Sequence, residues 1–165
     1  MMRVALDSDA NGAGLKASLL AYLQSRPETE AVDLAYLTGR QGEDYPDVAL
    51  NMGKEILRKR FERGILICGT GLGMAIAANK IPGIYAGCCH DAYSAERLAK
   101  SNDAQVMTMG ALVIGCEAAK KIAEIWLNSS FDGGRSLPKV LRTREIEKEF
   151  WKMEPDDKAD LQNVD

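Results

Sequence analysis

The sequence contains no long apolar run. Its longest uncharged stretch, residues 64–79, contains four glycines and is shorter than the ~18 residues that a membrane-spanning helix needs. No apolar run of the kind found in a secretory signal peptide precedes the first acid, Asp7. These two absences predict a cytoplasmic protein without a membrane segment.

An excess of charge of one sign is also missing. The chain has 21 Lys and Arg residues against 24 Asp and Glu residues, and five of the acids lie in residues 154–165. Binding to a phosphate backbone needs a concentrated basic face, so we expect no nucleic-acid partner. With 165 residues, of which 46% are hydrophobic, the chain suits one domain. We predict a single domain over residues 1–153 and a disordered acidic tail over 154–165.

The four cysteines do not have the spacing of a disulfide scaffold or of CxxC pairs. They are Cys68, Cys88, Cys89 and Cys116, and a cytoplasmic compartment would keep them reduced. Cys88, Cys89 and the only histidine, His90, could form a zinc site, but adjacent residues on a strand point to opposite faces. We therefore expect thiols that fill the core, and no metal.

Short apolar runs alternate with helical apolar periods along most of the chain. This alternation is typical of an α/β fold with a mostly parallel sheet. A polar loop is expected over residues 38–45. The expected strands cover residues 3–6, 31–37, 64–68, 84–89 and 105–109, and the expected helices cover the segment before Pro27 and residues 47–60, 73–80, 91–100, 117–128 and 143–153.

Candidate ligand-binding residues follow the strands, because open α/β sheets bind ligands at the carboxyl ends of their strands. The strongest signal is the run Cys68-Gly69-Thr70-Gly71-Leu72-Gly73, which leads from a buried strand into a helix. Its glycines let the backbone approach an anion, and its amides would stabilise a Cys68 thiolate that acts as a base or a nucleophile. The run matches neither the dinucleotide fingerprint nor the phosphate loop of nucleotide-binding proteins.

Three other polar residues follow strands. Asp7 and Asp9 could contact sugar hydroxyls or cap the first helix. His90 could serve as an acid or base, or be a hydrogen-bonded structural residue. The residues alone leave these alternatives open.

Several motifs together resemble those of the type B ribose-5-phosphate isomerases, whose relatives include the galactose-6-phosphate and erythrulose-4-phosphate isomerases. The resemblance covers residues 3 to about 150. Its motifs are residues 68–73, 77–84, Asp44-Tyr45-Pro46, His90-Asp91-Ala92-Tyr93-Ser94-Ala95, Ser101-Asn102-Asp103-Ala104-Gln105-Val106 and Phe131-Asp132-Gly133-Gly134-Arg135.

The resemblance implies a Rossmann-like three-layer α/β/α sandwich on a five-stranded parallel sheet. It also implies an aldose–ketose isomerase of small sugar phosphates that works through an enediolate, without metal or cofactor. Members of the family are homodimers or homotetramers with the active site between two subunits. The alternative interpretation is a nucleotide- or sugar-phosphate-binding module without catalysis.

Positions that match the family carry expected roles. Cys68 resembles the catalytic base, and the loop that follows it resembles the site that holds the enediolate oxygen. We expect Cys68 and Thr70 to be catalytic, Gly69, Gly71, Leu72 and Gly73 to hold the oxyanion, Asp9 and Asn102 to contact the sugar, and Arg135 and Lys139 to bind the phosphate.

Three positions depart from the family pattern. Ser101 replaces a histidine assigned to opening the sugar ring, while Ala10 and Leu112 replace a histidine and an arginine that contact phosphate or substrate. A serine cannot supply the proton that ring opening needs near neutral pH. A tetrose 4-phosphate cannot close a five-membered ring, because its phosphate occupies O4. We therefore predict a preference for erythrose 4-phosphate and erythrulose 4-phosphate over ribose 5-phosphate.

Overall fold

The computed structural model describes residues 1–152 and contains one parallel sheet in that range. The strand order is β2-β1-β3-β5-β4. The strands are β1 (Met2–Ser8), β2 (Thr29–Asp33), β3 (Arg63–Cys68), β4 (Ala86–Cys88) and β5 (Val106–Gly110), and the helices are α1 (Ala13–Gln24), α2 (Leu34–Thr38), α3 (Tyr45–Leu57), α4 (Leu72–Ala78), α5 (Ala92–Lys100), α6 (Cys116–Leu127) and α7 (Leu137–Lys152).

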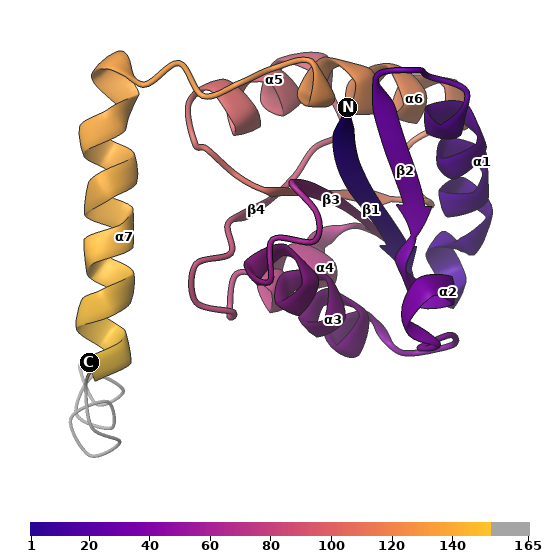
Figure 1. Ribbon diagram of the computed structural model, residues 1–165, viewed down its shortest axis with the longest axis horizontal. Coiled ribbons are helices and arrows are strands. Elements are labelled where there is room, and N and C mark those ends of the chain that lie inside the picture. Colours follow the sequence, from indigo (N-terminus) through magenta and orange to yellow (C-terminus); the bar gives the residue numbers. More distant parts are fainter. Residues whose placement is uncertain (153–165) are drawn as a thin grey trace.

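Helices cover both faces of the sheet (Figure 1). Apolar residues of α1, α5 and α6 pack on one face, and those of α2, α3 and α4 pack on the other. This arrangement confirms the predicted three-layer α/β/α sandwich. Two 3-10 turns, Ala10–Gly12 and Gly134–Ser136, complete the described elements. The expected tail, 154–165, lies outside the described residues.

The central strand β3 determines which way Cys68 faces. Its residues from Gly64 to Cys68 are buried, as expected for a strand covered on both faces. Successive side chains alternate between the faces, so Ile65 and Ile67 pack toward α1 and α6 while Leu66 and Cys68 pack toward α3 and α4. Cys68 therefore lies at the carboxyl end of the sheet, on the side of α4.

The predicted strand over residues 31–37 is wrong at its end, because residues 34–38 form α2. The carboxylate of Asp33 accepts a hydrogen bond from the backbone N–H of Tyr36 at 3.2 Å and caps this helix. Gly39 then ends it with a φ of +68°. The apolar run Leu34-Ala35-Tyr36-Leu37 suits either structure, and the cap decides for the helix.

The predicted strand over residues 84–89 is shorter in the structure. The backbone N–H of Tyr85 donates to the side-chain oxygen of Gln105 instead of to a neighbouring strand. At Ala86 the amide side chain of Asn79 takes the place of a further strand, since it bonds both the N–H and the carbonyl of Ala86 at 2.9 and 2.8 Å. The edge strand is thereby reduced to residues 86–88.

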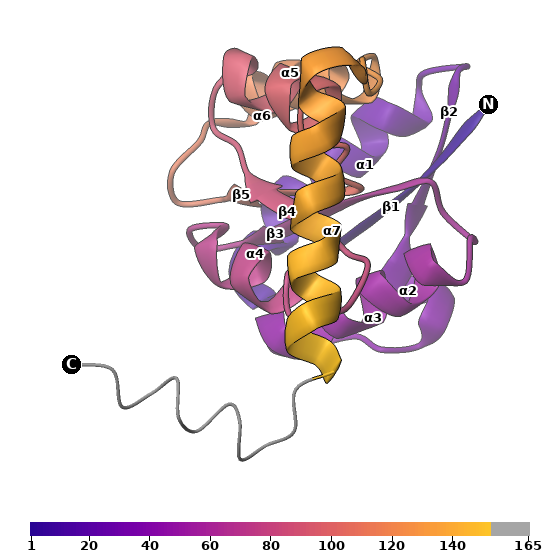
Figure 2. The ribbon, with the colours of Figure 1, turned by 90° about the vertical axis from the view of Figure 1, so that its left-hand side faces the viewer.

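Helix α7 begins at Leu137, six residues before the predicted start at Thr143. Figures 1 and 2 show it outside the two helical layers, beside the β4 edge of the sheet. Its Glu147 carboxylate accepts hydrogen bonds from the backbone of Gly83 and the hydroxyl of Tyr85, both at 3.0 Å. No helix within residues 1–152 is long and apolar enough to cross a membrane.

Candidate active site

The turn after β3 is held tightly against β5. Gly71 has a φ of +80°, and a Cβ there would lie 2.7 Å from Cys88 Sγ and 2.8 Å from the carbonyl carbon of Met109. The hydroxyl of Thr108 donates to the Gly71 carbonyl at 2.8 Å. Only glycine fits this position, because both the dihedral angle and the available space exclude a side chain.

The sulfur of Cys68 lies inside this turn. It is buried, and it accepts a hydrogen bond from the backbone N–H of Gly71 at 3.1 Å. The carbonyls of Cys68 and Gly69 accept from Ala111 and Leu112 at 2.8 and 3.0 Å, which fixes the backbone on both sides. An N–H aimed at the sulfur stabilises a thiolate, which is the form that can remove a proton.

Thr70 and Leu72 are exposed at the tip of the turn. The side-chain oxygen of Thr70 accepts from the N–H of Leu72 at 3.3 Å, so its hydroxyl hydrogen is available to donate. The Leu72 side chain is exposed, and its N–H is already bonded to Thr70, so the structure does not present this amide as a free donor for the oxyanion. Gly73 packs against the ring of Tyr45, from which a Cβ would be 2.9 Å away.

Asp9 lies beside this turn and caps the first 3-10 turn. Its carboxylate accepts from the N–H of Gly12 at 3.1 Å, and its own N–H donates to the Ile67 carbonyl at 3.3 Å. The capping role, left open by the sequence, is therefore present. The side-chain amide nitrogen of Asn11 lies 4.0 Å from the Cβ position of Gly69, so Asp9 and Asn11 border the turn that holds Cys68.

His90 is held by the backbone, as the structural interpretation predicts. Its Nε2 accepts from the N–H of Gly110 at 2.8 Å, so the neutral ring carries its proton on Nδ1. Cys88 Sγ lies 3.9 Å from Nε2, and burial raises the pKa of both Cys88 and Cys89, the latter to about 12. In residues 1–152 no three His, Cys, Asp or Glu side chains gather as a metal site.

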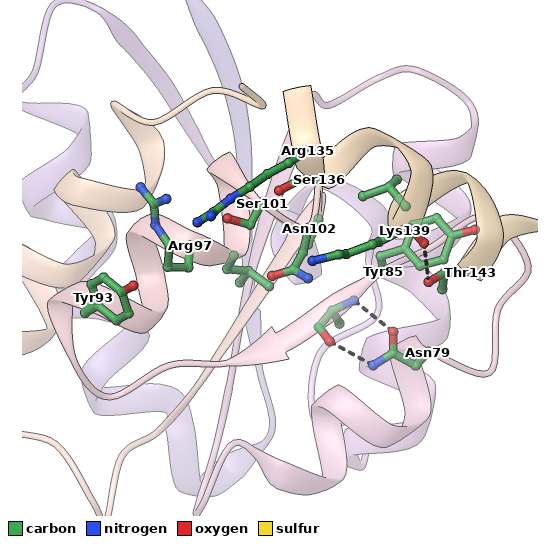
Figure 3. A pocket seen from close by; sticks show the side chains of 14 residues that line it. Asn79, Tyr85, Tyr93, Arg97, Ser101, Asn102, Arg135, Ser136, Lys139 and Thr143 are labelled. Carbon is green, nitrogen blue, oxygen red and sulfur yellow. Dashed lines mark hydrogen bonds between the residues drawn. The ribbon is translucent and has the colours of Figure 1, made fainter. Parts of the chain in front are cut away.

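The remaining predicted residues lie elsewhere in the molecule. Asn102, Arg135 and Lys139 line a cavity of about 530 Å³ between α5 and the start of α7, together with Ser101 (Figure 3). Neither Asp9 nor the turn that holds Cys68 contributes to this cavity. One chain thus divides the predicted site into two groups.

The Cys68 turn and the cavity that holds Asn102, Arg135 and Lys139 lie at different levels along the strands. The strand register places Ala86, which lines the cavity, level with Gly64, four residues or about 13 Å before Cys68 along the sheet. A sugar of four or five carbons, with bonds of about 1.5 Å, does not span a separation of that size. Within one chain the two groups therefore do not form one site for a small sugar phosphate.

The sequence patterns missed two side chains that border these groups. Tyr45 belongs to the motif Asp44-Tyr45-Pro46, to which the sequence assigns no role, yet its ring covers Gly73. Arg97 lies on α5 and lines the same cavity as Arg135. Helical spacing was the available signal for Arg97, because Tyr93, Arg97 and Ser101 recur every four residues and share one helix face.

Comparison with known proteins identifies the family. The family model described as "Ribose/Galactose Isomerase" matches residues 4–142. The chain belongs to the ribose/galactose isomerase family. It is 46% identical over 140 residues to the D-erythrulose-4-phosphate isomerase of Pectobacterium atrosepticum, covering 85% of this chain and 91% of that protein. It is 47% identical over 146 residues to the ribose-5-P isomerase B of Listeria innocua, covering 88% and 97%.

A solved structure supports the same assignment. The Clostridium thermocellum ribose-5-phosphate isomerase B superposes with a TM-score of 0.83 at 38% identity, covering 90% of this chain and 99% of that one. The resemblance read from the motifs and the predicted fold class are both confirmed. The two relatives are almost equally identical to this ribose/galactose isomerase family member. One of them is named for D-erythrulose 4-phosphate and the other for ribose 5-phosphate. Overall similarity therefore does not select the sugar.

Proposed function

We propose that the protein interconverts erythrose 4-phosphate and erythrulose 4-phosphate in preference to the ribose 5-phosphate pair. That it is an aldose–ketose isomerase of sugar phosphates follows from its family. The observation that carries the chemistry is the buried Cys68 sulfur, which accepts the Gly71 N–H at the end of the central strand. A base and an oxyanion site are the two elements that proton abstraction beside a carbonyl requires.

The geometry supports the following steps. The Cys68 thiolate removes the proton from C2 of the open-chain aldose, and the electron pair moves to the carbonyl oxygen. The amides of residues 69–73 that are not bonded to Cys68 or Thr70 stabilise the resulting enediolate, and the Thr70 hydroxyl donates to one of its oxygens. The proton of the O2 hydroxyl moves to O1, and the Cys68 thiol returns its proton to C1. This gives the ketose, with its carbonyl at C2, and restores the thiolate.

A second copy of the chain completes the site in this proposal. The Cys68 turn of one subunit acts on the reacting carbons, while Asn102, Arg135 and Lys139 of its partner hold the sugar and the phosphate. The separation of these groups within one chain supports this arrangement. We expect a homodimer or homotetramer.

The preference for a tetrose rests on Ser101. It lines the cavity beside Asn102, where a histidine would be needed to protonate the ring oxygen of a cyclic sugar. No histidine lines this cavity, because the single histidine of the sequence, His90, is hydrogen-bonded to the backbone of Gly110 elsewhere in the molecule. A tetrose 4-phosphate stays open-chain and does not need that proton.

Turnover by the purified chain tests the proposal. Erythrose 4-phosphate, ribose 5-phosphate and galactose 6-phosphate are each supplied in a coupled assay, and kcat/KM is expected to be highest for the tetrose. Higher kcat/KM for ribose 5-phosphate would contradict the tetrose preference. Binding of all three sugars without turnover would favour the module without catalysis.

A Ser101→His variant tests the reason for the preference. It is expected to raise kcat/KM for ribose 5-phosphate by about 10- to 100-fold, the range of a positioned acid. Ser136→His is the matched control, because Ser136 lines the same cavity from the 3-10 turn before α7. Equal gains in both variants, or none in Ser101→His, would refute the ring-opening argument.

A further inference from the structure

The cavity beside α5 is lined by cations without a carboxylate. Its charged residues are Arg97 from α5, Arg135 from the 3-10 turn before α7, and Lys139 from α7 itself. Figure 3 shows Arg135 extending toward Arg97, with Lys139 pointing toward Asn102. Three positive charges around one cavity repel one another, so the cavity suits a ligand with more than one negative charge.

The three cations differ in how the protein neutralises them. Among residues 1–152, Arg135 and Lys139 have no ion pair. Arg97 contacts Glu96 through Nη2 at 2.9 Å, but the same carboxylate also holds Lys100 at 2.9 Å. One acid shared between two cations leaves the α5 side of the cavity positive, as the α7 side is.

Arg97 also has a donor that nothing in the described chain satisfies. Its Nε is buried and has no hydrogen-bond partner. Buried donors of charged groups are nearly always paired, so the Nε of Arg97 is open to an acceptor from outside the described chain. Its guanidinium carbon lies 5.8 Å from the centre of the Tyr93 ring, so an aromatic face, which accepts no strong hydrogen bond, occupies one side.

We propose that Arg97 is a third anion-binding side chain, which holds the phosphate of the substrate together with Arg135 and Lys139. This inference rests on the proposed function, because it assigns the substrate's phosphate to this cavity. A dianionic phosphate monoester supplies the acceptor that Arg97 lacks, once the guanidinium turns its free N–H groups toward the cavity. Ala10 and Leu112 bear no charge and no polar side chain, so neither of them holds an anion.

The test separates phosphate binding from catalysis. Binding of inorganic phosphate is measured by calorimetry, and kcat and KM are measured with erythrulose 4-phosphate, for the full chain and for Arg97→Gln. Loss of a charge-assisted contact is expected to raise both the phosphate Kd and KM about 10- to 100-fold while kcat changes less than about twofold. Arg97→Lys is expected to recover part of the affinity.

Lys100→Gln is the matched control. Lys100 lies on the same helix and shares Glu96, but it does not line the cavity. Because Lys100 does not line the cavity, its removal is expected to weaken Kd and KM far less than the removal of Arg97 does, although it leaves Glu96 to Arg97 alone. Equal weakening in Lys100→Gln would assign the effect to general charge, and an unchanged Kd in a folded Arg97→Gln would also overturn the proposal. A fall in kcat alone would do the same.

Failure of the proposed function gives a different result. If the full chain turns over no sugar phosphate, yet Arg97→Gln weakens phosphate binding far more than Lys100→Gln does, the isomerase assignment fails and the anion site stands. Absence of phosphate binding to the full chain overturns the anion site itself.

Discussion

Asp7 is a buried carboxyl group two residues before Asp9, only 1% exposed to solvent. Burial raises its pKa from the ordinary value of 3.8 to about 6, although the Ser8 N–H at 2.8 Å and the nearby Lys16 favour the charged form. Asp33 and Glu43 face it as well and oppose its ionisation. Near neutral pH the fold therefore contains a carboxylate that is costly to bury.

Asp7→Asn is expected to stabilise the protein in a pH-dependent way. Because the folded-state pKa is raised, the folded protein holds the proton more tightly, and wild-type stability falls as pH rises from about 4 to about 6. The variant escapes this loss, with a gain of at most about 3 kcal/mol at pH 8 and none near pH 3. Denaturant unfolding at pH 3, 6 and 8, at one protein concentration, measures the difference. A gain that is equal at all three values would contradict the assignment to Asp7.

Cys68→Ala is expected to abolish most turnover while the protein stays folded. The sulfur is the proposed base, and removing one small side chain opens only a minor cavity. A fall in kcat of at least about 100-fold is expected in the coupled assay. Cys116→Ala, which removes a thiol at the start of α6, is the control and should keep its activity. Near wild-type kcat in folded Cys68→Ala would refute the role.

At the scale of elements, the apolar runs predicted the sheet well and its edges poorly. The central strand β3 is buried on both faces, so a continuous apolar run identified it. Strand β4 and helix α2 depend on single side chains, the Gln105 amide and the Asp33 carboxylate, which replace backbone partners. The early start of α7 left a signal in Pro138, because proline is accepted in a first helical turn.

The residues of the candidate site differ in how well the sequence predicts them. Cys68 and its glycine turn could be predicted, because they follow a buried strand directly. Helical spacing groups Arg97 with Ser101 but does not assign it a role, because its place opposite Arg135 depends on how α7 turns back toward α5. A contact between distant segments leaves no periodic trace in a single sequence.

Gly71→Ala tests how tightly the turn after β3 packs against β5. A Cβ would meet Cys88 Sγ at 2.7 Å and the Met109 backbone at 2.8 Å, so the turn must shift away from β5. Both the free energy of unfolding and kcat are expected to fall, the former by about 1–3 kcal/mol. Gly115→Ala, where a Cβ meets nothing within 4 Å, should keep its kcat and lose less stability, because it alters only the N-cap of α6. Wild-type stability in Gly71→Ala would contradict the tight packing of the turn.

At the scale of the whole molecule, the division of the proposed site between two groups predicts complementation. At a substrate concentration well below KM, Cys68→Ala and Arg135→Ala are each expected to have little activity alone, the first through kcat and the second through KM. In a mixed dimer, the intact Cys68 of the second variant meets the intact Arg135 of the first, so one of the two sites is complete. Co-expressed and purified mixtures should therefore recover activity, up to about half in the mixed dimer.

A mixture of the two variants that recovers no activity would contradict a site shared between two subunits. If each chain holds a complete site, both sites in a mixed dimer stay damaged and mixing restores nothing. A double variant with both substitutions in one chain, mixed with Cys68→Ala, is the matched control, because none of its sites can combine both intact residues. Recovery in that control would contradict the shared-site geometry.

The Asn79 amide that bonds both backbone groups of Ala86 also bears on aggregation. An unpaired edge strand is a template on which another chain can extend a sheet into a fibre. Here the edge is only three residues long, and an internal side chain already occupies the donor and the acceptor at its first residue. At the β4 edge, the backbone groups of Ala86 are therefore bonded within the same chain. Neighbouring molecules in a crowded cell have few free backbone groups at this edge for strand addition.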